Sequence, residues 1–307
     1  MTESPGFIQK LEKEGFRASV VSAAHLPELE REISELHDKG LLCEDLYHQY
    51  ENQYFHPKLP TNFRNAKSII IMATPQPMIK TTIQWKGKDL QFIVPPTYFD
   101  GNKVTREARA ALARALGTRR RYKLVRGLLP QKLLAVRSGL AMYGRNNITY
   151  VPGFGSLYRL TSFYTDYDSP VDYWQEKQAL PKCGKCKACM NACPTKAIQG
   201  DRFLLHVDHC LTYLNEKKST EPFPDWVGPQ SHNALIGCMR CQMACPYDRE
   251  VKENFEDRGR FSEDEVKYLL KGDFRGQKAK AMEKKLGTIG LDLSIFPRNL
   301  KAVLDQI

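Results

Sequence analysis

The sequence lacks the long apolar segments that membrane-spanning proteins need. No run of about 18 apolar residues occurs in the chain of 307 residues, so no transmembrane helix is expected. The first residues, MTESPGFIQKLEKEGF, contain neither the apolar stretch of a secretory signal nor a pair of adjacent arginines. These absences predict a cytoplasmic protein that does not contact a membrane. In that compartment, paired cysteines are more often metal ligands than disulfides.

Acidic residues are missing from a long central stretch. Residues 108–165 contain no Asp or Glu, and residues 102–138 contain eleven Lys or Arg against one acid, Glu107. A solvated basic face would explain this pattern. A surface that binds nucleic-acid phosphates, an anionic cofactor or an acidic electron-donor protein would explain it equally well. Charge alone leaves these alternatives open; the nucleic-acid alternative would depend on Arg119, Arg120 and Arg121.

The sequence also has no G-x-G-x-x-G or P-loop fingerprint, so no nucleotide site of these kinds is indicated. It does contain a stretch rich in glycine, asparagine and aromatic residues, GLAMYGRNNITYVPGFGSLYRLTSFYTD. Glycines in such a stretch predict turns at which the backbone comes close to another group. That group is either neighbouring protein backbone or a flat, bulky cofactor. The glycines are Gly139, Gly144, Gly153 and Gly155.

Cysteine is scarce, yet eight of the nine cysteines lie within one region. CGKCKACMNACPTKAI has the spacing C-x2-C-x2-C-x3-C followed by proline, and GCMRCQMACPYD supplies three more cysteines, again with proline after the last. In such a run three cysteines wrap one [4Fe–4S] cluster and the next cysteine ligates a second cluster. The proline stops the turn from continuing as a helix. Zinc is the competing interpretation, but it usually needs separated C-x2-C pairs.

Eight thiolates divide over two [4Fe–4S] clusters without remainder, which favours iron–sulfur over zinc. Two clusters held in this way lie close enough to exchange electrons. Cys43 is left over and is expected to be a small packing residue. His206 and His209 precede Cys210 but are not needed as ligands. The predicted ligands are Cys183, Cys186, Cys189 and Cys245 for cluster 1, and Cys193, Cys210, Cys238 and Cys241 for cluster 2.

The hydrophobic pattern predicts an α+β fold in three parts. Residues 1–171 form an α/β domain, residues 172–251 the ferredoxin-like double-cluster module, and residues 252–307 short helices that pack on the body. The expected elements are a helix from Pro5 to Gly15, a strand at 16–23, a helix from Pro27, a buried strand at 66–77, a hairpin around Lys86-Gly87-Lys88, helices at 105–116 and 130–138, a helix with a Ser262/Glu265 capping box that ends at Gly272, and a last helix at 297–307.

These motifs, together with DHCLTYLNEK around Cys210, resemble those of the epoxyqueuosine reductase family, which are cobalamin-dependent iron–sulfur enzymes related to reductive dehalogenases. The resemblance is best over residues 129–250. It implies a base-off cobalamin next to the cluster module, electrons supplied by a low-potential donor such as ferredoxin or flavodoxin, and a substrate that is a small molecule or a nucleic acid. The alternative is an electron-transfer or reductive-activation protein without substrate chemistry of its own.

The resemblance also implies roles for residues of the α/β domain. Family members carry an aspartate as proton donor where this chain has the acid-free YKLVRGLLPQKLLAVRSGL. Glycine backbone would let a corrin ring approach, and polar side chains would meet its amides and phosphate. The candidate proton donors are Tyr143, Tyr98 and Lys132. The candidate cofactor-binding residues are Gly139, Gly144, Arg145, Asn146, Asn147, Gly155 and Ser156.

Overall fold

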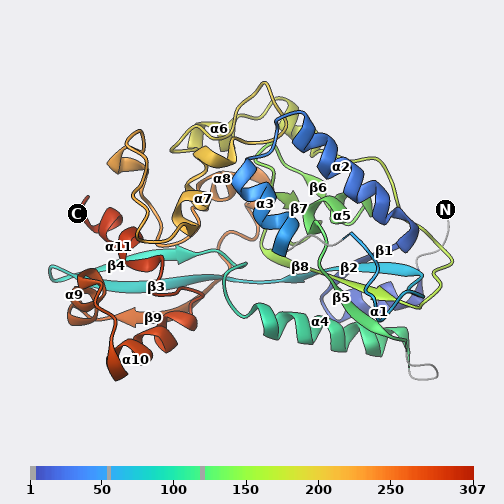
Figure 1. The fold of residues 1–307 in the computed structure, drawn as a ribbon, viewed down its shortest axis with the longest axis horizontal. Helices are drawn as coiled ribbons and strands as arrows, with labels where there is room; N and C mark the ends of the chain where they lie inside the picture. The colour runs from blue at the N-terminus through green and yellow to red at the C-terminus, as the bar shows by residue number, and fades with distance from the viewer. Residues whose placement is uncertain (1–4, 54–56, 118–121) are drawn as a thin grey trace. The chain divides into compact units, whose positions relative to one another are not determined.

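The computed structural model describes residues 5–53, 57–117 and 122–307 and shows mixed α and β structure, as predicted (Figure 1). The chain forms two compact units, each built from two stretches of sequence. Unit 1 comprises residues 1–75 and 102–186, and unit 2 comprises residues 76–101 and 187–307. The sequence predicted three contiguous domains with boundaries after residues 171 and 251, and these boundaries stay a prediction.

Unit 1 is built on an antiparallel sheet with the strand order β1–β2–β8–β5. Its central strand β2 is buried on both faces, which explains its continuous apolar sequence. Ile69 and Ile71 pack into one core, and Ile70 packs into another on the opposite face. The strands are β1 (Arg17–Ser22), β2 (Ser68–Pro75), β5 (Leu124–Gly127) and β8 (Tyr158–Thr165).

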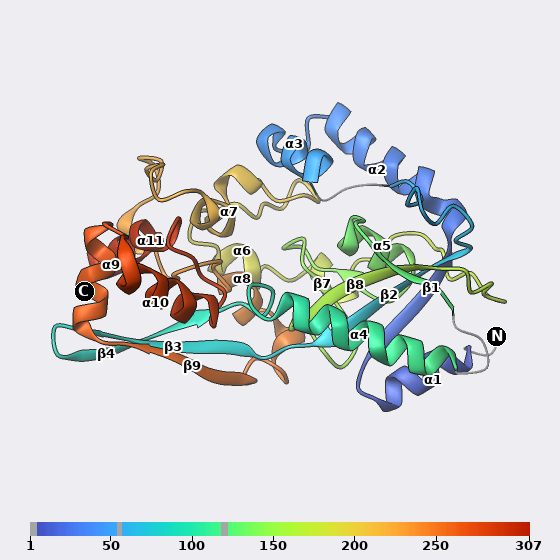
Figure 2. The ribbon, with the colours of Figure 1, turned by 60° about the horizontal axis from the view of Figure 1, so that its bottom comes forward.

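Helices cover both faces of this sheet (Figure 2). One core joins β2 to α1 and α4, and the other joins it to α2 and α5. Helix α4 begins at Gly101, earlier than the periodicity predicted. The helices are α1 (Gly6–Lys13), α2 (Leu26–Asp38), α3 (Glu44–Gln53), α4 (Gly101–Leu116) and α5 (Gln131–Arg137), with a short 3-10 turn at Ala23–His25.

Unit 2 contains the predicted hairpin, whose turn places Lys86 and Gly87 at positive φ (49° and 74°). A third strand, β9, runs parallel to β3. The capping box of Ser262 and Glu265 is present, and Gly272 ends that helix in the left-handed conformation, as predicted. The elements are β3 (Met78–Trp85), β4 (Lys88–Val94), β9 (Phe255–Phe261), α9 (Glu263–Lys271), α10 (Gly276–Gly287) and α11 (Phe296–Leu304).

The remaining elements are short and lie around the cysteines. Most of them are single turns, because the ligand motifs contain prolines and glycines that end regular structure. They are β6 (Met142–Tyr143), β7 (Thr149–Tyr150), α6 (Ala188–Ala192), α7 (Leu211–Glu216), α8 (Arg240–Met243), and 3-10 turns at Pro181–Gly184, Val207–His209, Pro229–Ser231 and Pro246–Asp248.

A hydrogen bond to the Glu44 carboxylate, 3.1 Å away, raises the pKa of His37, at the end of α2, above the usual value of a histidine. Its ring also stacks on Tyr47 of α3. Since the folded-state pKa is the higher one, the stabilisation of α3 is present at low pH and is lost as the pH rises through that value. Histidine NMR titration measures the midpoint, and Glu44→Gln should lower it; an unchanged midpoint would contradict this assignment.

Candidate functional site

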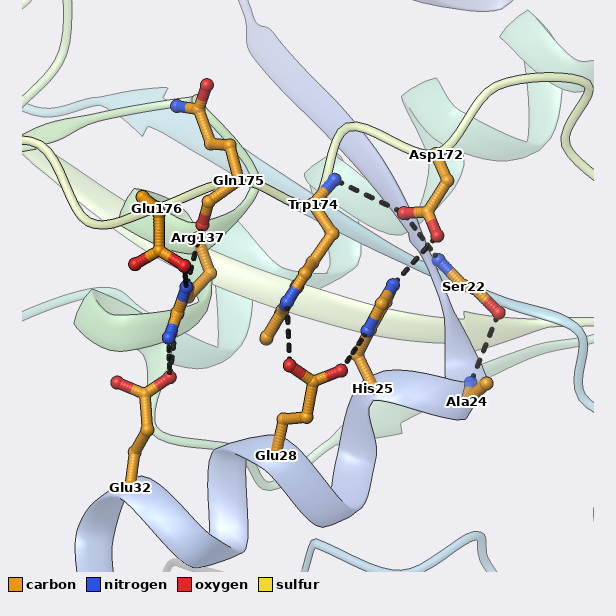
Figure 3. A network of polar contacts seen from close by, with 10 residues as sticks. All are labelled: Ser22, Ala24, His25, Glu28, Glu32, Arg137, Asp172, Trp174, Gln175 and Glu176. Carbon is orange, nitrogen blue, oxygen red and sulfur yellow. Dashed lines mark hydrogen bonds and ion pairs between the residues drawn. The ribbon is translucent and has the colours of Figure 1, made fainter.

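Cys183 and Cys186 follow a segment, residues 172–180, that is fastened to the rest of unit 1 (Figure 3). Trp174 stacks on His25 with a ring separation of 4.3 Å and an interplanar angle of 3°. The two ring nitrogens of His25 lie 2.5 Å from Glu28 and 2.8 Å from Asp172. The hydrogen bond from His25 lowers the pKa of the Glu28 carboxyl below its usual value. We call residues 172–180 the strap.

A buried ion pair holds the same strap. Glu32 accepts from Arg137 and from Lys177, each at 2.6 Å, and its side chain is only 9% exposed. Arg137 also donates to the Gln175 carbonyl at 3.0 Å and lies over the Trp174 ring. Burial acts to lower the pKa of Arg137, but the contacts with Glu32 outweigh it and the net shift is upward. No pattern in the sequence indicated this network.

Beyond these contacts, the strap forms one isolated parallel β-bridge with β6, between Ala179 and Tyr143. The Tyr143 N–H donates to the Gln178 carbonyl at 2.9 Å, and the Leu180 N–H donates to the Tyr143 carbonyl at 2.8 Å. Arg145 then donates to the carbonyl of Cys183 at 2.7 Å. The main chain that carries Cys183 is therefore held by the β6–β7 hairpin.

The cysteines of unit 2 gather in a largely buried cluster. Cys189 and Cys193 are buried, and Cys210 and Cys241 pack against them. Cys238 interacts electrostatically with both Cys193 and Cys210. The structure thus places three predicted ligands of cluster 2, Cys193, Cys210 and Cys241, in one group with Cys189, which the spacing assigns to cluster 1.

Hydrogen-bond donors point at several of these sulfurs. The Ala197 N–H donates to Cys193 Sγ at 3.2 Å, and the Asn233 amide lies 3.6 Å from Cys238 Sγ. Burial raises the pKa of the Cys210 thiol, and backbone N–H groups that bond to its sulfur act in the opposite direction. Such donors stabilise thiolates that bind metal and tune the potential of an iron–sulfur cluster.

Helix α11 fastens the loops on either side of these cysteines. The buried Asn299 amide donates to the carbonyls of Asn215 at 2.8 Å and Leu235 at 2.9 Å. Arg298 donates to the Leu214 carbonyl at 2.6 Å, at the end of the helix that follows Cys210. Helix α11 therefore holds together the loops that precede and follow these cysteines.

The three proton-donor candidates have different surroundings. Tyr143 is inside unit 1, and burial raises its pKa well above the usual value, so its phenol keeps the proton at neutral pH. Lys132 Nζ donates to the Asn147 carbonyl at 3.1 Å. Tyr98, in unit 2, donates to the Glu216 carboxylate. Their proposed roles stay predictions.

The candidate cofactor-binding residues of the hairpin have protein partners. Asn146, Asn147 and Ser156 are buried. The Asn146 amide donates to the Tyr150 hydroxyl at 3.0 Å. A Cβ at Gly144 would lie 2.6 Å from both Asn146 and Tyr150, so this glycine serves close packing of the protein itself.

Gly139, Gly153 and Gly155 have positive φ, in agreement with the predicted turns. Four of the eleven cations of the basic stretch lie on α4, among them Arg114, which pairs with Glu14 at 2.6 Å. Arg119, Arg120 and Arg121 are outside the described residues. Within the described ranges, no helix is long and apolar enough to cross a membrane.

Among the residues that the structure describes, no three His, Cys, Asp or Glu side chains converge closely enough to hold one metal ion. A [4Fe–4S] cluster is larger than a single ion, so its cysteine ligands lie farther apart than the ligands of one ion. The observed distances between the side chains are therefore compatible with a cluster. Cys43 stands apart from both predicted ligand sets in the sequence, and its carbonyl accepts from the Tyr47 N–H in α3.

Comparison with known proteins supports the iron–sulfur interpretation. Residues 182–248 match the family model of the 4Fe-4S double cluster binding domain. The chain is 31% identical over 133 residues to an epoxyqueuosine reductase of Lactococcus garvieae, a match that covers 42% of this chain and 35% of that protein. The matched part therefore spans about a third of that relative's length.

The fold has solved counterparts. An epoxyqueuosine reductase from Streptococcus thermophilus matches with a TM-score of 0.67 and 21% identity, over 97% of this chain and 80% of that one. An epoxyqueuosine reductase crystallised with an epoxyqueuosine-modified tRNA-Tyr stem loop matches with a TM-score of 0.67 and 19% identity, over the same shares. At these identities the likeness establishes the fold.

Proposed function

We propose that this chain, which is similar to epoxyqueuosine reductases in its cysteine region and in its fold, is an iron–sulfur reductase in which two [4Fe–4S] clusters carry electrons to a substrate-reducing centre. The double-cluster match over residues 182–248 carries this proposal, because it covers all eight cysteines outside position 43. Electron transfer through two clusters needs a reductant, and a low-potential protein such as ferredoxin or flavodoxin is the proposed donor.

The proposed ligands remain those that the spacing indicates. For cluster 2, support comes from the buried group around Cys193, with N–H donors aimed at its sulfurs. For cluster 1, support comes from the turn at Pro181–Gly184 that carries Cys183. The proposed sets are Cys183, Cys186, Cys189 and Cys245, and Cys193, Cys210, Cys238 and Cys241.

A corrinoid is the proposed substrate-reducing cofactor, and it would supply a cobalt centre that takes electrons from the clusters. One observation fits such a ligand: Gln131 Oε1, on α5, is buried and accepts no hydrogen bond from the described residues. Corrin amides are suitable donors for such an oxygen. Arg145 and Asn146 fit less well, because their polar groups are bonded within unit 1. Gly139, Gly155 and Ser156 stay candidates.

A nucleic acid is the proposed substrate class. A structural relative has been crystallised with a modified tRNA stem loop. In this chain the exposed cations of residues 102–138, such as Lys103, Arg106 and Arg109 on α4, would supply contacts to phosphates. Binding of RNA should then weaken steeply as salt increases, with a slope that reports the number of phosphates neutralised.

Anaerobic purification with iron, sulfide and cobalt measured together tests the proposal. We expect about eight irons per chain for two four-iron clusters. Cobalamin added to this protein should give the absorption spectrum of the base-off form. Clusters without corrinoid binding would point to an electron-transfer protein instead. Zinc, or far less iron, would overturn the proposal as a whole.

A further inference from the structure

Arg145 contacts the main chain of the first cysteine motif. Its Nη2 lies 2.7 Å from the Cys183 carbonyl and 3.4 Å from the Gly184 carbonyl, and its Nε lies 3.3 Å from the Cys183 carbonyl. Arg145 as a residue is half-buried. A planar guanidinium can bond several oxygens at once, which fixes its position better than a single bond would. One full positive charge is therefore held beside Cys183.

The turn that presents Arg145 is itself braced. Lys132 Nζ donates to the Asn147 carbonyl, and Asn147 adopts the left-handed conformation with φ of 56°. The Ile148 N–H donates to Asn146 Oδ1 at 3.2 Å. Gly144 leaves room for these contacts. Such bracing means that Arg145 does not need to be ordered by a ligand.

We infer that Arg145 is a positioning residue that raises the reduction potential of cluster 1. This inference rests on the proposed function, because it takes Cys183 as a ligand of that cluster. One-electron reduction adds a negative charge to the cluster and forms or breaks no bond. A fixed cation nearby stabilises the reduced form, and net charge and hydrogen bonding are known determinants of cluster potential.

The lysines of the same motif provide the comparison. Lys182 and Lys185 flank Cys183 in sequence, but both are exposed. Charges in water are screened by solvent and salt, whereas a half-buried charge is screened much less. If closeness in the sequence alone decided the effect on the potential of cluster 1, these lysines would act as strongly as Arg145. Arg145 differs from them because it is half-buried and hydrogen-bonded to the main chain.

Redox titration of the anaerobic holoprotein with dithionite, followed by EPR, tests the inference. In Arg145→Gln one of the two midpoint potentials should become more negative, and the other should stay unchanged. Arg145→Lys keeps the charge and should shift that potential less. Lys185→Gln removes a charge from the same motif and should shift it least, by an amount that disappears at high salt.

The outcomes separate the inference from its premise. If the wild type contains no iron–sulfur clusters, the proposed function fails and the inference fails with it. If the wild type shows two clusters and Arg145→Gln leaves both potentials unchanged, only the inference is overturned. Equal shifts in Arg145→Gln and Lys185→Gln would also overturn it, because the fixed geometry of Arg145 would then have no effect. Iron content, measured for each variant, shows that the compared proteins carry the same clusters.

Discussion

Cys193→Ala is expected to remove about half of the iron and sulfide from anaerobically purified protein, because one of the two proposed clusters loses a ligand. Cys193 is 8% exposed, and its sulfur accepts a hydrogen bond from the Ala197 N–H. Water therefore has little access to replace the missing thiolate. Iron and sulfide per chain, together with EPR of the reduced protein, measure the effect: one cluster signal should vanish and the other should persist.

Cys43→Ala is the matched control, since it removes a thiol from outside the proposed ligand sets. It should retain the iron of the wild type. Cys186→Ala extends the test, because it should abolish the signal that Cys193→Ala leaves in place. Full iron in Cys193→Ala would contradict its role as a ligand. Loss of the same signal in Cys186→Ala and Cys193→Ala would contradict the division of the ligands between two clusters.

The cluster motif and several local elements were readable from the sequence because their determinants are close together in the chain. The spacing of the cysteines decides which sulfurs share a turn. The hairpin at Lys86-Gly87 and the capping box of Ser262 and Glu265 each depend on residues within four positions. The hairpin and the capping box were predicted correctly, and the assignment of the cysteines to two clusters stays a prediction.

Contacts between distant residues left no such local signal. Arg137 and Glu32 are 105 residues apart, and Trp174 and Glu28 are 146 apart. Neither pair differs in type from ordinary surface residues, so only the tertiary fold reveals them. Strand β9 was missed for a similar reason: its sequence FEDRGRF is mostly polar, and its pairing with β3 decides its conformation.

Arg145 illustrates a different limit. The family resemblance made Arg145 a candidate for contacting a cofactor phosphate, and the structure shows hydrogen bonds to main-chain carbonyls. Both partners are oxygen acceptors, so the residue type alone cannot distinguish them. The same holds for Asn146, a predicted cofactor contact whose amide donates to the Tyr150 hydroxyl in the structure.

Glu32→Gln is expected to destabilise unit 1 by about 3 kcal/mol, because Arg137 loses its buried carboxylate partner and keeps only the exposed Glu176. The Arg137 and Glu32 side chains are only 11% and 9% exposed, so water cannot replace the lost carboxylate well. Urea unfolding of the anaerobic protein measures the loss. Hydrogen exchange should also become faster in the strap, because Arg137 and Lys177 tie it to Glu32.

Glu176→Gln is the matched control for this prediction, since Glu176 pairs with the same Arg137 at 3.3 Å but is 85% exposed. An exposed pair contributes little, so this variant should lose less than about 0.5 kcal/mol. Both variants remove a carboxylate partner of the same arginine. The difference between their losses in the free energy of unfolding therefore measures the effect of burying the partner. Equal losses would contradict the buried pair as the fastening of the strap. A loss in Glu32→Gln without faster exchange in the strap would place the effect of Glu32 elsewhere in unit 1.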